Sequence, residues 1–153
     1  MTPALQIHLA VTGDAARIAA MSRDLIEAGL GWSWTEARVR RSLGDPNTNV
    51  TVACDEEQLA GFGIMKYRDA EAHLHLLAVR ESHRRCGVGS ALMAWLERTA
   101  LVAGIGVIYL EARATNDAAR AFYGTLGYRE IKLVPGYYRG VESAVRLAKD
   151  LWA

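Results

Sequence analysis

Residues 77–92 read Leu-Ala-Val-Arg-Glu-Ser-His-Arg-Arg-Cys-Gly-Val-Gly-Ser-Ala-Leu, and this stretch decides the predicted fold. An apolar strand end leads into a loop with the spacing Arg84-x-x-Gly87-x-Gly89, and the loop leads directly into an amphipathic helix. Glycine lets the backbone approach a ligand closely. The first turn of a helix carries unpaired N–H groups and a partial positive charge. The stretch therefore predicts a cradle for a phosphate or pyrophosphate group.

Two better-known phosphate loops do not fit this stretch. No Gly-Lys-Ser/Thr follows the glycines, so the stretch is not an NTP-binding P-loop, and the third glycine of the dinucleotide fingerprint is missing after Gly89. The alternative that remains open is a glycine-rich turn in which Arg84 and Arg85 are simply solvated.

The elements on either side of this loop predict a mixed α+β domain spanning residues 1–153. The strand 71–79 alternates, with Ala72, Leu74 and Leu76 on one face and the histidines at 73 and 75 on the other. A loop is expected at 135–140. The remaining strands are expected at 7–10, 50–54, 59–67, 106–112, 128–133 and 142–151, and helices at 15–28, 35–43, 88–103 and 117–126.

Composition narrows the class of protein. The chain has 153 residues, of which 51% are hydrophobic and 23% charged, and its net charge of +1 is not that of a dedicated nucleic-acid binder. Its two cysteines do not make a disulfide framework or a zinc site and suit a reducing compartment. There is no secretory signal pattern and no apolar run of ~20 residues. We expect a soluble, cytoplasmic protein that binds neither nucleic acid nor membranes.

A second motif extends the pattern. Residues 110–128 read Leu-Glu-Ala-Arg-Ala-Thr-Asn-Asp-Ala-Ala-Arg-Ala-Phe-Tyr-Gly-Thr-Leu-Gly-Tyr. Together with the loop at 84–89, this segment resembles the signatures of the Gcn5-related N-acetyltransferases (GNAT), and within that superfamily the ribosomal-protein alanine Nα-acetyltransferase type. The resemblance implies a mostly antiparallel central sheet of about seven strands flanked by about four helices. It also implies acetyl-CoA as co-substrate and no metal.

The resemblance also implies roles for individual residues. Backbone N–H groups near Leu77, Ala78 and Val79 would polarise the thioester, and Asn116 would contact the pantetheine arm, although Asn116 is also a good helix N-cap. Residues proposed to hold the pyrophosphate are Arg84, Arg85, Cys86, Gly87, Val88, Gly89 and Ser90.

Acetyl transfer needs a proton acceptor for the amine and a proton donor for the departing thiolate. We expect Glu111 to be the general base, acting through water, and Tyr123 to be the general acid that also lies against the cofactor. A structural ion pair between Glu111 and Arg113, two residues along the same strand face, is the open alternative. Cys86 as an acetyl-carrying nucleophile is disfavoured.

The resemblance also implies an acceptor site, and aromatic residues are expected to form it. Trp32, Trp34, Tyr137 and Tyr138 are expected to line it, with packing over the core as the alternative for the two tryptophans. His73 and His75 are expected to be residues of a polar strand face rather than metal ligands.

The sequence thus favours an N-acetyltransferase that acts on a protein or peptide N-terminal amine by direct transfer. Alternatives are transfer to a small amine and a non-catalytic acyl-CoA-binding module. A homodimer could form by edge pairing through residues 142–151.

Overall fold

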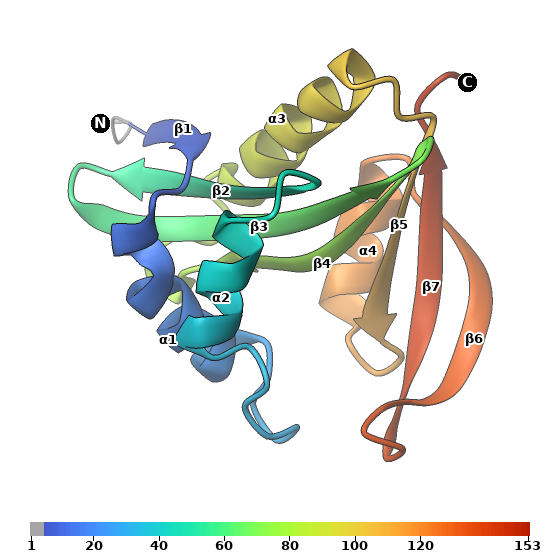
Figure 1. Ribbon diagram of the computed structural model, residues 1–153. Coiled ribbons are helices and arrows are strands. Elements are labelled where there is room, and N and C mark those ends of the chain that lie inside the picture. Colours follow the sequence, from blue (N-terminus) through green and yellow to red (C-terminus); the bar gives the residue numbers. More distant parts are fainter. Residues whose placement is uncertain (1–4) are drawn as a thin grey trace.

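The computed structural model describes residues 5–153 and arranges seven strands in one sheet (Figure 1). The strand order is β1-β2-β3-β4-β5-β7-β6, and every neighbouring pair is antiparallel except β4 and β5. This confirms the predicted α+β class. The strands are β1 (Leu5–Leu9), β2 (Thr48–Asp55), β3 (Gln58–Arg68), β4 (Glu71–Val79), β5 (Val107–Arg113), β6 (Arg129–Tyr138) and β7 (Glu142–Asp150).

Helices cover both faces of the sheet (Figure 1). On one face, α1 (Ala15–Leu25) and α2 (Glu36–Leu43) bury a cluster that includes Ile18, Val39 and Phe62. On the other face, α3 (Val88–Val102) and α4 (Asp117–Thr125) bury a second cluster that includes Leu96 and Ile108. Short 3-10 helices at Thr12–Asp14 (η1) and Glu81–His83 (η2) precede α1 and α3. Among residues 5–153, no helix is long and apolar enough to cross a membrane.

The helix α1 is shorter than predicted. It ends at Leu25 rather than near residue 28, because the N–H groups of Ile26 and Glu27 both bond back to the carbonyl of Ser22 and close the last turn. Gly29 follows in the left-handed region at a φ of 80°, a conformation that favours glycine. The chain then enters the loop between α1 and α2, which borders the site described below.

The sheet divides between β4 and β5. Their parallel pairing runs from Glu71↔Val107 to Leu74↔Leu110 and stops there, although both strands continue. At the same place β4 contains a bulge, because Ile64 faces Leu76 and Met65 faces Leu74, which leaves His75 as an extra residue. The two strands therefore diverge beyond these positions and form a V (Figure 1).

The bulge corrects the predicted alternation of β4. Leu74 packs with the cluster beneath α3, whereas Leu76 packs with the cluster beneath α1. One extra residue in a strand moves every later side chain to the opposite face. The simple alternation expected for 71–79 is thus wrong after Leu74, and a pattern of apolar residues alone does not reveal such an insertion.

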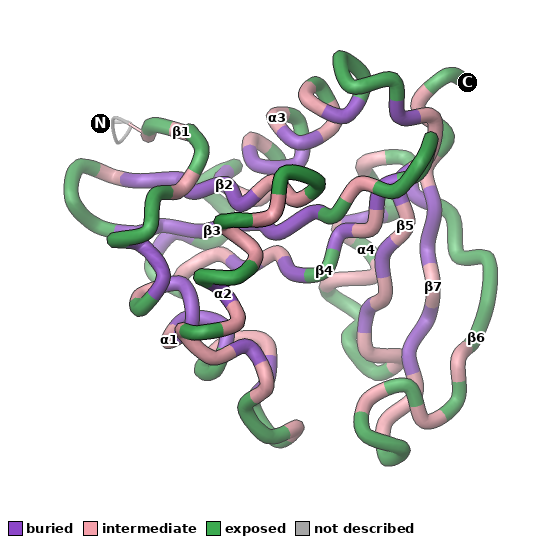
Figure 2. Tube along the Cα trace, viewed as in Figure 1, coloured by how far each residue is buried: buried purple, intermediate pink, exposed green. Residues whose placement is uncertain are grey.

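The carboxyl-terminal hairpin corrects two further expectations. Residues 135–138 are the end of strand β6 rather than part of a loop, so Tyr137 and Tyr138 belong to a strand. The strand β7 lies between β5 and β6 and is paired on both edges, so the dimer proposed through residues 142–151 is wrong. The free edge at this end belongs to β6, which is mostly exposed (Figure 2).

Glycines in β3 allow close packing beside the V. A Cβ added at Gly61 would lie 2.7 Å from the carbonyl oxygen of Ala78 and 3.1 Å from Leu92, and one added at Gly63 would lie 2.9 Å from Leu96. Real side chains do not tolerate such separations from a backbone oxygen. The absence of side chains at Gly61 and Gly63 therefore lets α3 and the end of β4 approach β3 closely.

We expect Gly61→Ala to lower the free energy of unfolding by about 1–3 kcal/mol, because the new methyl group must displace the backbone of β4. Gly124→Ala is the matched control. Gly124 lies in α4 with nothing within 4 Å of an added Cβ. That change should raise stability by about 0.4–1 kcal/mol. Urea unfolding followed by circular dichroism measures both, and equal effects of the two substitutions would contradict the packing argument.

Candidate active site

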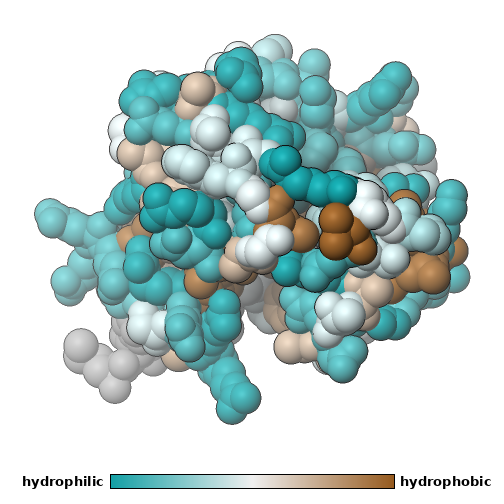
Figure 3. All heavy atoms as spheres, turned by 90° about the horizontal axis from the view of Figure 1, so that it is seen from below, coloured by the Kyte–Doolittle hydropathy of each residue, from teal (hydrophilic) through white to brown (hydrophobic). Residues whose placement is uncertain are grey.

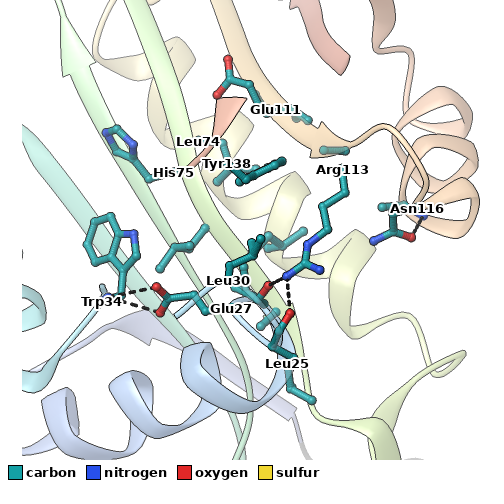
Figure 4. A pocket seen from close by; sticks show the side chains of 18 of the residues that line it. Leu25, Glu27, Leu30, Trp34, Leu74, His75, Glu111, Arg113, Asn116 and Tyr138 are labelled. Atoms are coloured by element: carbon teal, nitrogen blue, oxygen red, sulfur yellow. Dashed lines mark hydrogen bonds between the residues drawn. The ribbon is translucent and has the colours of Figure 1, made fainter. Parts of the chain in front are cut away.

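A cavity of about 860 Å³ occupies the opening of the V. Its walls come from the α1–α2 loop, the diverging ends of β4 and β5, the start of α4 and the end of β6 (Figure 4). Viewed from below, the molecule shows a mainly hydrophilic surface with a few hydrophobic side chains grouped near its centre (Figure 3). The cavity is therefore a polar-rimmed cleft that reaches the sheet itself.

The loop before α3 is shaped as the sequence predicted. Arg85 and Gly87 take positive φ values of 64° and 80°, and α3 begins at Val88. The helix geometry leaves the N–H groups of Val88, Gly89 and Ser90 without intrahelical partners. These amides, the helix dipole and the neighbouring arginines are the features that the predicted anion cradle requires at the end of β4.

A buried histidine anchors this loop, which the sequence analysis did not foresee. His83 donates through Nε2 to the Asp55 carboxylate at 3.1 Å, and its Nδ1 accepts from the Ser82 hydroxyl at 2.9 Å. The guanidinium of Arg80 also donates to the carbonyl of Leu59 at 2.8 Å. These bonds fasten the loop to the turn between β2 and β3 and thereby fix where the cradle lies.

The structure distributes the predicted cofactor residues over three settings. Arg85 and Cys86 are exposed, and the Cys86 thiol is directed to the carbonyl of Arg84 at 3.6 Å. Val88 is buried in the core, and Gly87, Gly89 and Ser90 form the helix start without lining the cavity. The cavity is lined by Leu77, Ala78, Val79, Arg84, Asn116 and Tyr123.

Asn116 has the structural role that was weighed against a ligand contact. Its side-chain oxygen accepts from the N–H of Ala119 at 3.0 Å and caps α4. The residue also lines the cavity, so its amide NH₂ group is at the cavity wall. Capping and ligand contact are compatible for this side chain, because the cap uses only the oxygen.

Glu111 is a buried carboxylate at the centre of a polar network. Arg146, directly opposite on β7, donates to it at 2.6 Å, and the Tyr137 hydroxyl donates at 3.1 Å. His73 also hydrogen-bonds to it. Burial raises the pKa of Glu111, but the hydrogen bonds from His73 and Arg146 outweigh burial and lower the pKa to about 2. The side chain is thus ionised throughout the physiological range.

The ion pair expected as an alternative for Glu111 has different partners. Arg113 does not pair with it, because residues two apart in a strand are separated by ~6.7 Å, whereas a cross-strand neighbour lies closer. Arg113 instead contacts Glu142 at 3.4 Å and donates to the carbonyls of Ile26 and Ala28 at 2.7 and 2.8 Å. Figure 4 shows this side chain reaching across the cavity to the α1–α2 loop.

Glu27 holds the same loop from within, and the sequence analysis missed it. Its carboxylate accepts from the Ser22 hydroxyl at 3.0 Å, from the N–H and hydroxyl of Ser33 at 2.7 and 2.6 Å, and from the N–H of Trp34 (Figure 4). Burial raises the pKa of Glu27, but these hydrogen bonds outweigh it and lower the pKa. A lone acidic residue before a Gly-Leu-Gly turn carries no sequence signal for such a role.

Three tyrosines face the cavity. Tyr123 is buried, packs edge-on against Phe122 and Tyr128, and has its pKa raised by burial, so the phenol is protonated at neutral pH. Burial raises the pKa of Tyr137 to about 12, and that of Tyr138 likewise to about 12. All three predicted tyrosines are therefore brought together, with Glu111, around one space.

The two predicted tryptophans separate. Trp34 is buried, lines the cavity and lies under the guanidinium of Arg38 at 3.7 Å. Trp32 is 43% exposed, does not line the cavity and donates its indole N–H to the carbonyl of Ala19 at 3.3 Å. Of the pair, only Trp34 is placed to contact an acceptor.

The two histidines of β4 have different neighbours. His73 is bound to Glu111, and His75 lies on the cavity wall with its ring 6.0 Å from that of Trp34. Burial, His73 and Arg38 together lower the pKa of His75 to about 4. Within residues 5–153, no group of three or more histidine, cysteine or acidic side chains is arranged to hold a metal ion.

Comparison with known proteins decides the family. The model of the acetyltransferase (GNAT) family matches residues 19–128. The chain belongs to this family. GNAT proteins of this kind are acyltransferases, which agrees with the predicted enzyme class and with the cradle, cleft and tyrosine described above.

Named relatives of this GNAT protein include N-acetyltransferases. It is 31% identical to the ribosomal protein bS18-alanine N-acetyltransferase of Salmonella typhimurium over 75% of this chain and 79% of that protein. It is 41% identical to an uncharacterized N-acetyltransferase of Methanocaldococcus jannaschii over 78 residues, about half the length of each chain. These relatives bear out the resemblance to the ribosomal-protein type.

Solved structures agree with the fold. The ribosomal-protein-S18-alanine N-acetyltransferase of Escherichia coli superimposes with a TM-score of 0.84 and 25% identity over 96% of this chain and 94% of that one. Arabidopsis thaliana NAA60, solved in complex with acetyl-CoA, superimposes with a TM-score of 0.84 over 97% of this chain and 99% of that one, at 16% identity. The latter likeness concerns the fold alone.

The Glu111 network should make stability depend on pH. The ordinary pKa of this carboxyl group is 4.5 and the folded value is about 2, so its contribution is fully present above pH 4.5 and is lost as the pH falls towards 2. We expect the difference in unfolding free energy between the wild type and Glu111→Gln to shrink over this range. Urea unfolding at several pH values measures it, with the exposed turn residue change Glu57→Gln as control. A difference that stays constant from pH 6 to pH 2.5 would contradict the shift.

Proposed function

We propose that this GNAT protein transfers the acetyl group of acetyl-CoA directly to the N-terminal α-amine of a peptide or protein. One observation carries the proposal: a single cavity extends from Arg84, at the anion cradle, along the end of β4 to Tyr123 and Glu111. A cofactor with its pyrophosphate beside Arg84 and an amine bound near Glu111 would thus lie in the same cavity. A reducing, cytoplasmic location belongs to the same proposal and is supported by two free cysteines.

The residues present fit acetyl-CoA as the donor. The amides at the start of α3 and Arg84 suit the pyrophosphate, and the diverging end of β4 leaves backbone groups of Leu77–Val79 facing the cavity instead of β5. A strand edge without a partner offers N–H and C=O groups to a pantetheine arm. Membership of the acetyltransferase (GNAT) family supports an acetyl donor of this kind.

The chemistry needs few groups. The amine lone pair attacks the thioester carbonyl carbon, the carbon–sulfur bond of the tetrahedral intermediate breaks, and the electron pair leaves with the sulfur. The buried Tyr123 phenol, protonated at neutral pH, donates a proton to that thiolate and regains one from solvent. The ammonium proton of the acceptor leaves through water next to Glu111. The products are the acetylated amine and free CoA.

Glu111 is a weak base, because its pKa is about 2. Its part in the reaction is to order water and stabilise positive charge on the incoming amine rather than to retain the proton. This favours an α-amine over a lysine side chain. With pKa values of about 8 and 10.4, the neutral fraction at pH 7 is roughly 10% for the α-amine and about 0.04% for lysine.

The first test is an acceptor panel. Release of free CoA thiol from acetyl-CoA would be followed with peptides bearing a free N-terminus, the same peptides blocked at the N-terminus but containing lysine, and small amines. We expect release that requires a free peptide N-terminus. Thiol release with small amines only would show that the acceptor is a small amine and not a peptide N-terminus. Tight uptake of acetyl-CoA with no transfer to any amine would favour the non-catalytic module.

Tyr123→Phe should lower kcat by about 10²- to 10⁴-fold while leaving the Kd for acetyl-CoA within about twofold, because it removes the proton donor and little contact area. Tyr67→Phe is the control, since the Tyr67 hydroxyl bonds to Asn49 and Thr99 away from the cavity. Steady-state rates and isothermal calorimetry provide the two numbers. Unchanged turnover in Tyr123→Phe would remove this residue from the acid role.

The pH profile distinguishes the two candidate bases. If the acceptor amine itself titrates, kcat/KM should rise with pH to a plateau near the α-amine pKa of about 7.7–8.0. The same limb should persist, at a lower rate, in Glu111→Gln. A limb that disappears on this substitution would show instead that Glu111 is the titrating base, with a pKa far above the value set by its partners.

A further inference from the structure

The acceptor end of the cavity carries positive charge that the protein leaves uncompensated. Both carboxylates on the cavity wall are occupied, Glu111 by Arg146 and His73, and Glu27 by the serines and the N–H of Trp34. Glu27 accepts only from neutral groups, so its charge still attracts Arg38, although the two form no ion pair. The arginines of α2 add positive charge at this end of the wall.

Arg38, from α2, lies on the wall of the cavity. It stacks on Trp34 and is close enough to His75 to lower the pKa of that ring, which is neutral at pH 7 for this reason together with burial. Within residues 5–153, Arg38 and Arg41 make no ion pair with a carboxylate, whereas their neighbour Arg40 pairs with Glu36 at 3.3 Å. One turn of α2 thus contains one compensated and two uncompensated arginines.

A second hollow continues the cavity at this point. It has a volume of about 360 Å³ and shares Trp34, Arg38 and His75 with the main cavity. Arg41 and Lys66 add two further cations to its wall. Its single carboxylate, Asp45, accepts hydrogen bonds from the N–H of Asn47 and the hydroxyl of Thr48, and lies 3.8 Å from the Lys66 ammonium.

The arginines also repel one another. Burial is the largest effect on the pKa of Arg38 and lowers it, the charge of Glu27 opposes this, and the charge of Arg41 lowers the pKa by a smaller amount. Like charges held together in a partly buried setting are costly without an anion between them. A ligand carboxylate placed there would relieve the repulsion and accept charge-assisted, bidentate hydrogen bonds from a guanidinium.

We propose that the hollow between α2, β3 and β4 binds carboxylate side chains that follow the acceptor amine, so that the preferred acceptor is a peptide N-terminus with acidic residues in its first few positions. This inference rests on the proposed function, since it concerns the acceptor of that reaction. A separate hollow beyond Trp34 favours an extended peptide over a small amino acid, because a small acceptor would not reach past the main cavity.

The test uses pairs of peptides of equal length with the same first residue and either two acidic or two basic residues after it. We expect kcat/KM with acetyl-CoA to be at least about tenfold higher for the acidic peptide in low salt. The ratio should fall as ionic strength approaches physiological values, where the Debye length is about 8 Å. Equal rates for both peptides, or a preference for the basic one, would overturn the proposal.

Variants of α2 locate the effect. Arg38→Gln should reduce the ratio of kcat/KM for the acidic peptide to that for the basic peptide about tenfold. Because Arg38 also stacks on Trp34, the stability of this variant must be checked by urea denaturation. Arg41→Glu is a second variant that leaves that stack in place and should raise kcat/KM for the basic peptide while lowering it for the acidic one. Arg40→Glu, on the same helix but outside the hollow, is the matched control and should leave the ratio within about twofold. If Arg41→Glu lowers kcat/KM equally for the acidic and the basic peptide, the effect of the substitution is structural only, which would contradict the assignment.

Two further outcomes separate this inference from the proposed function. Calorimetric uptake of acetyl-CoA with good transfer to neutral or basic peptides, but not to acidic ones, overturns the hollow as an acidic subsite and leaves the N-acetyltransferase intact. Failure to take up acetyl-CoA at all overturns the proposed function and this inference with it. Faster transfer to free glutamate or aspartate than to any peptide also overturns the choice of an extended acceptor.

Discussion

The rest of the structure depends on the point where β4 and β5 stop pairing. Four residue pairs hold the strands together, and beyond Leu74 and Leu110 the extra residue His75 turns β4 away from its neighbour. Backbone N–H and C=O groups that would otherwise form hydrogen bonds between the two strands are then left facing a cavity. A ligand that can pair with a strand edge has a prepared site there, and the cradle at the start of α3 lies at the end of the same strand.

The opening is kept in shape by buried charges rather than by apolar packing. Arg113 reaches from β5 to the carbonyls of the α1–α2 loop, and Glu27 binds that loop from the opposite side. Breaking one such partner would leave an uncompensated charge at low exposure, which is costly. The network around Glu111 similarly joins β4, β5, β6 and β7 at one carboxylate. Among the described residues, the arginines of α2, Arg38 and Arg41, make no ion pair and stay available to a ligand beside the acceptor end.

Motifs with strong local physics were readable from the sequence. The glycines at 87 and 89, followed by an amphipathic helix, predicted a turn and a helix start, and the structure contains both. Asn116 was predicted as an N-cap from its residue type alone. The element order followed from such local signals, and the family followed from the resemblance of residues 84–89 and 110–128 to its motifs. Interactions between segments that are distant in the sequence could not be predicted in the same way. The alternative considered for Glu111 was an ion pair with Arg113, two residues along its own strand. The partner comes from β7 instead, because register and strand order are set by the packing of the whole sheet.

The sequence by itself determined the class of fold and the turn and helix start at residues 87–89, because these depend on short-range backbone preference. Resemblance to the family's motifs placed Glu111 and Tyr123 among the expected site residues. Only the tertiary structure decided which side chains share the cleft. The bulge at His75, the interior position of β7 and the engagement of Glu27 each arise from long-range contacts, and a periodic pattern of apolar residues reads the same with or without them. Trp34 enters the cavity and Trp32 does not for the same reason: the direction of a loop residue depends on what the loop is tied to.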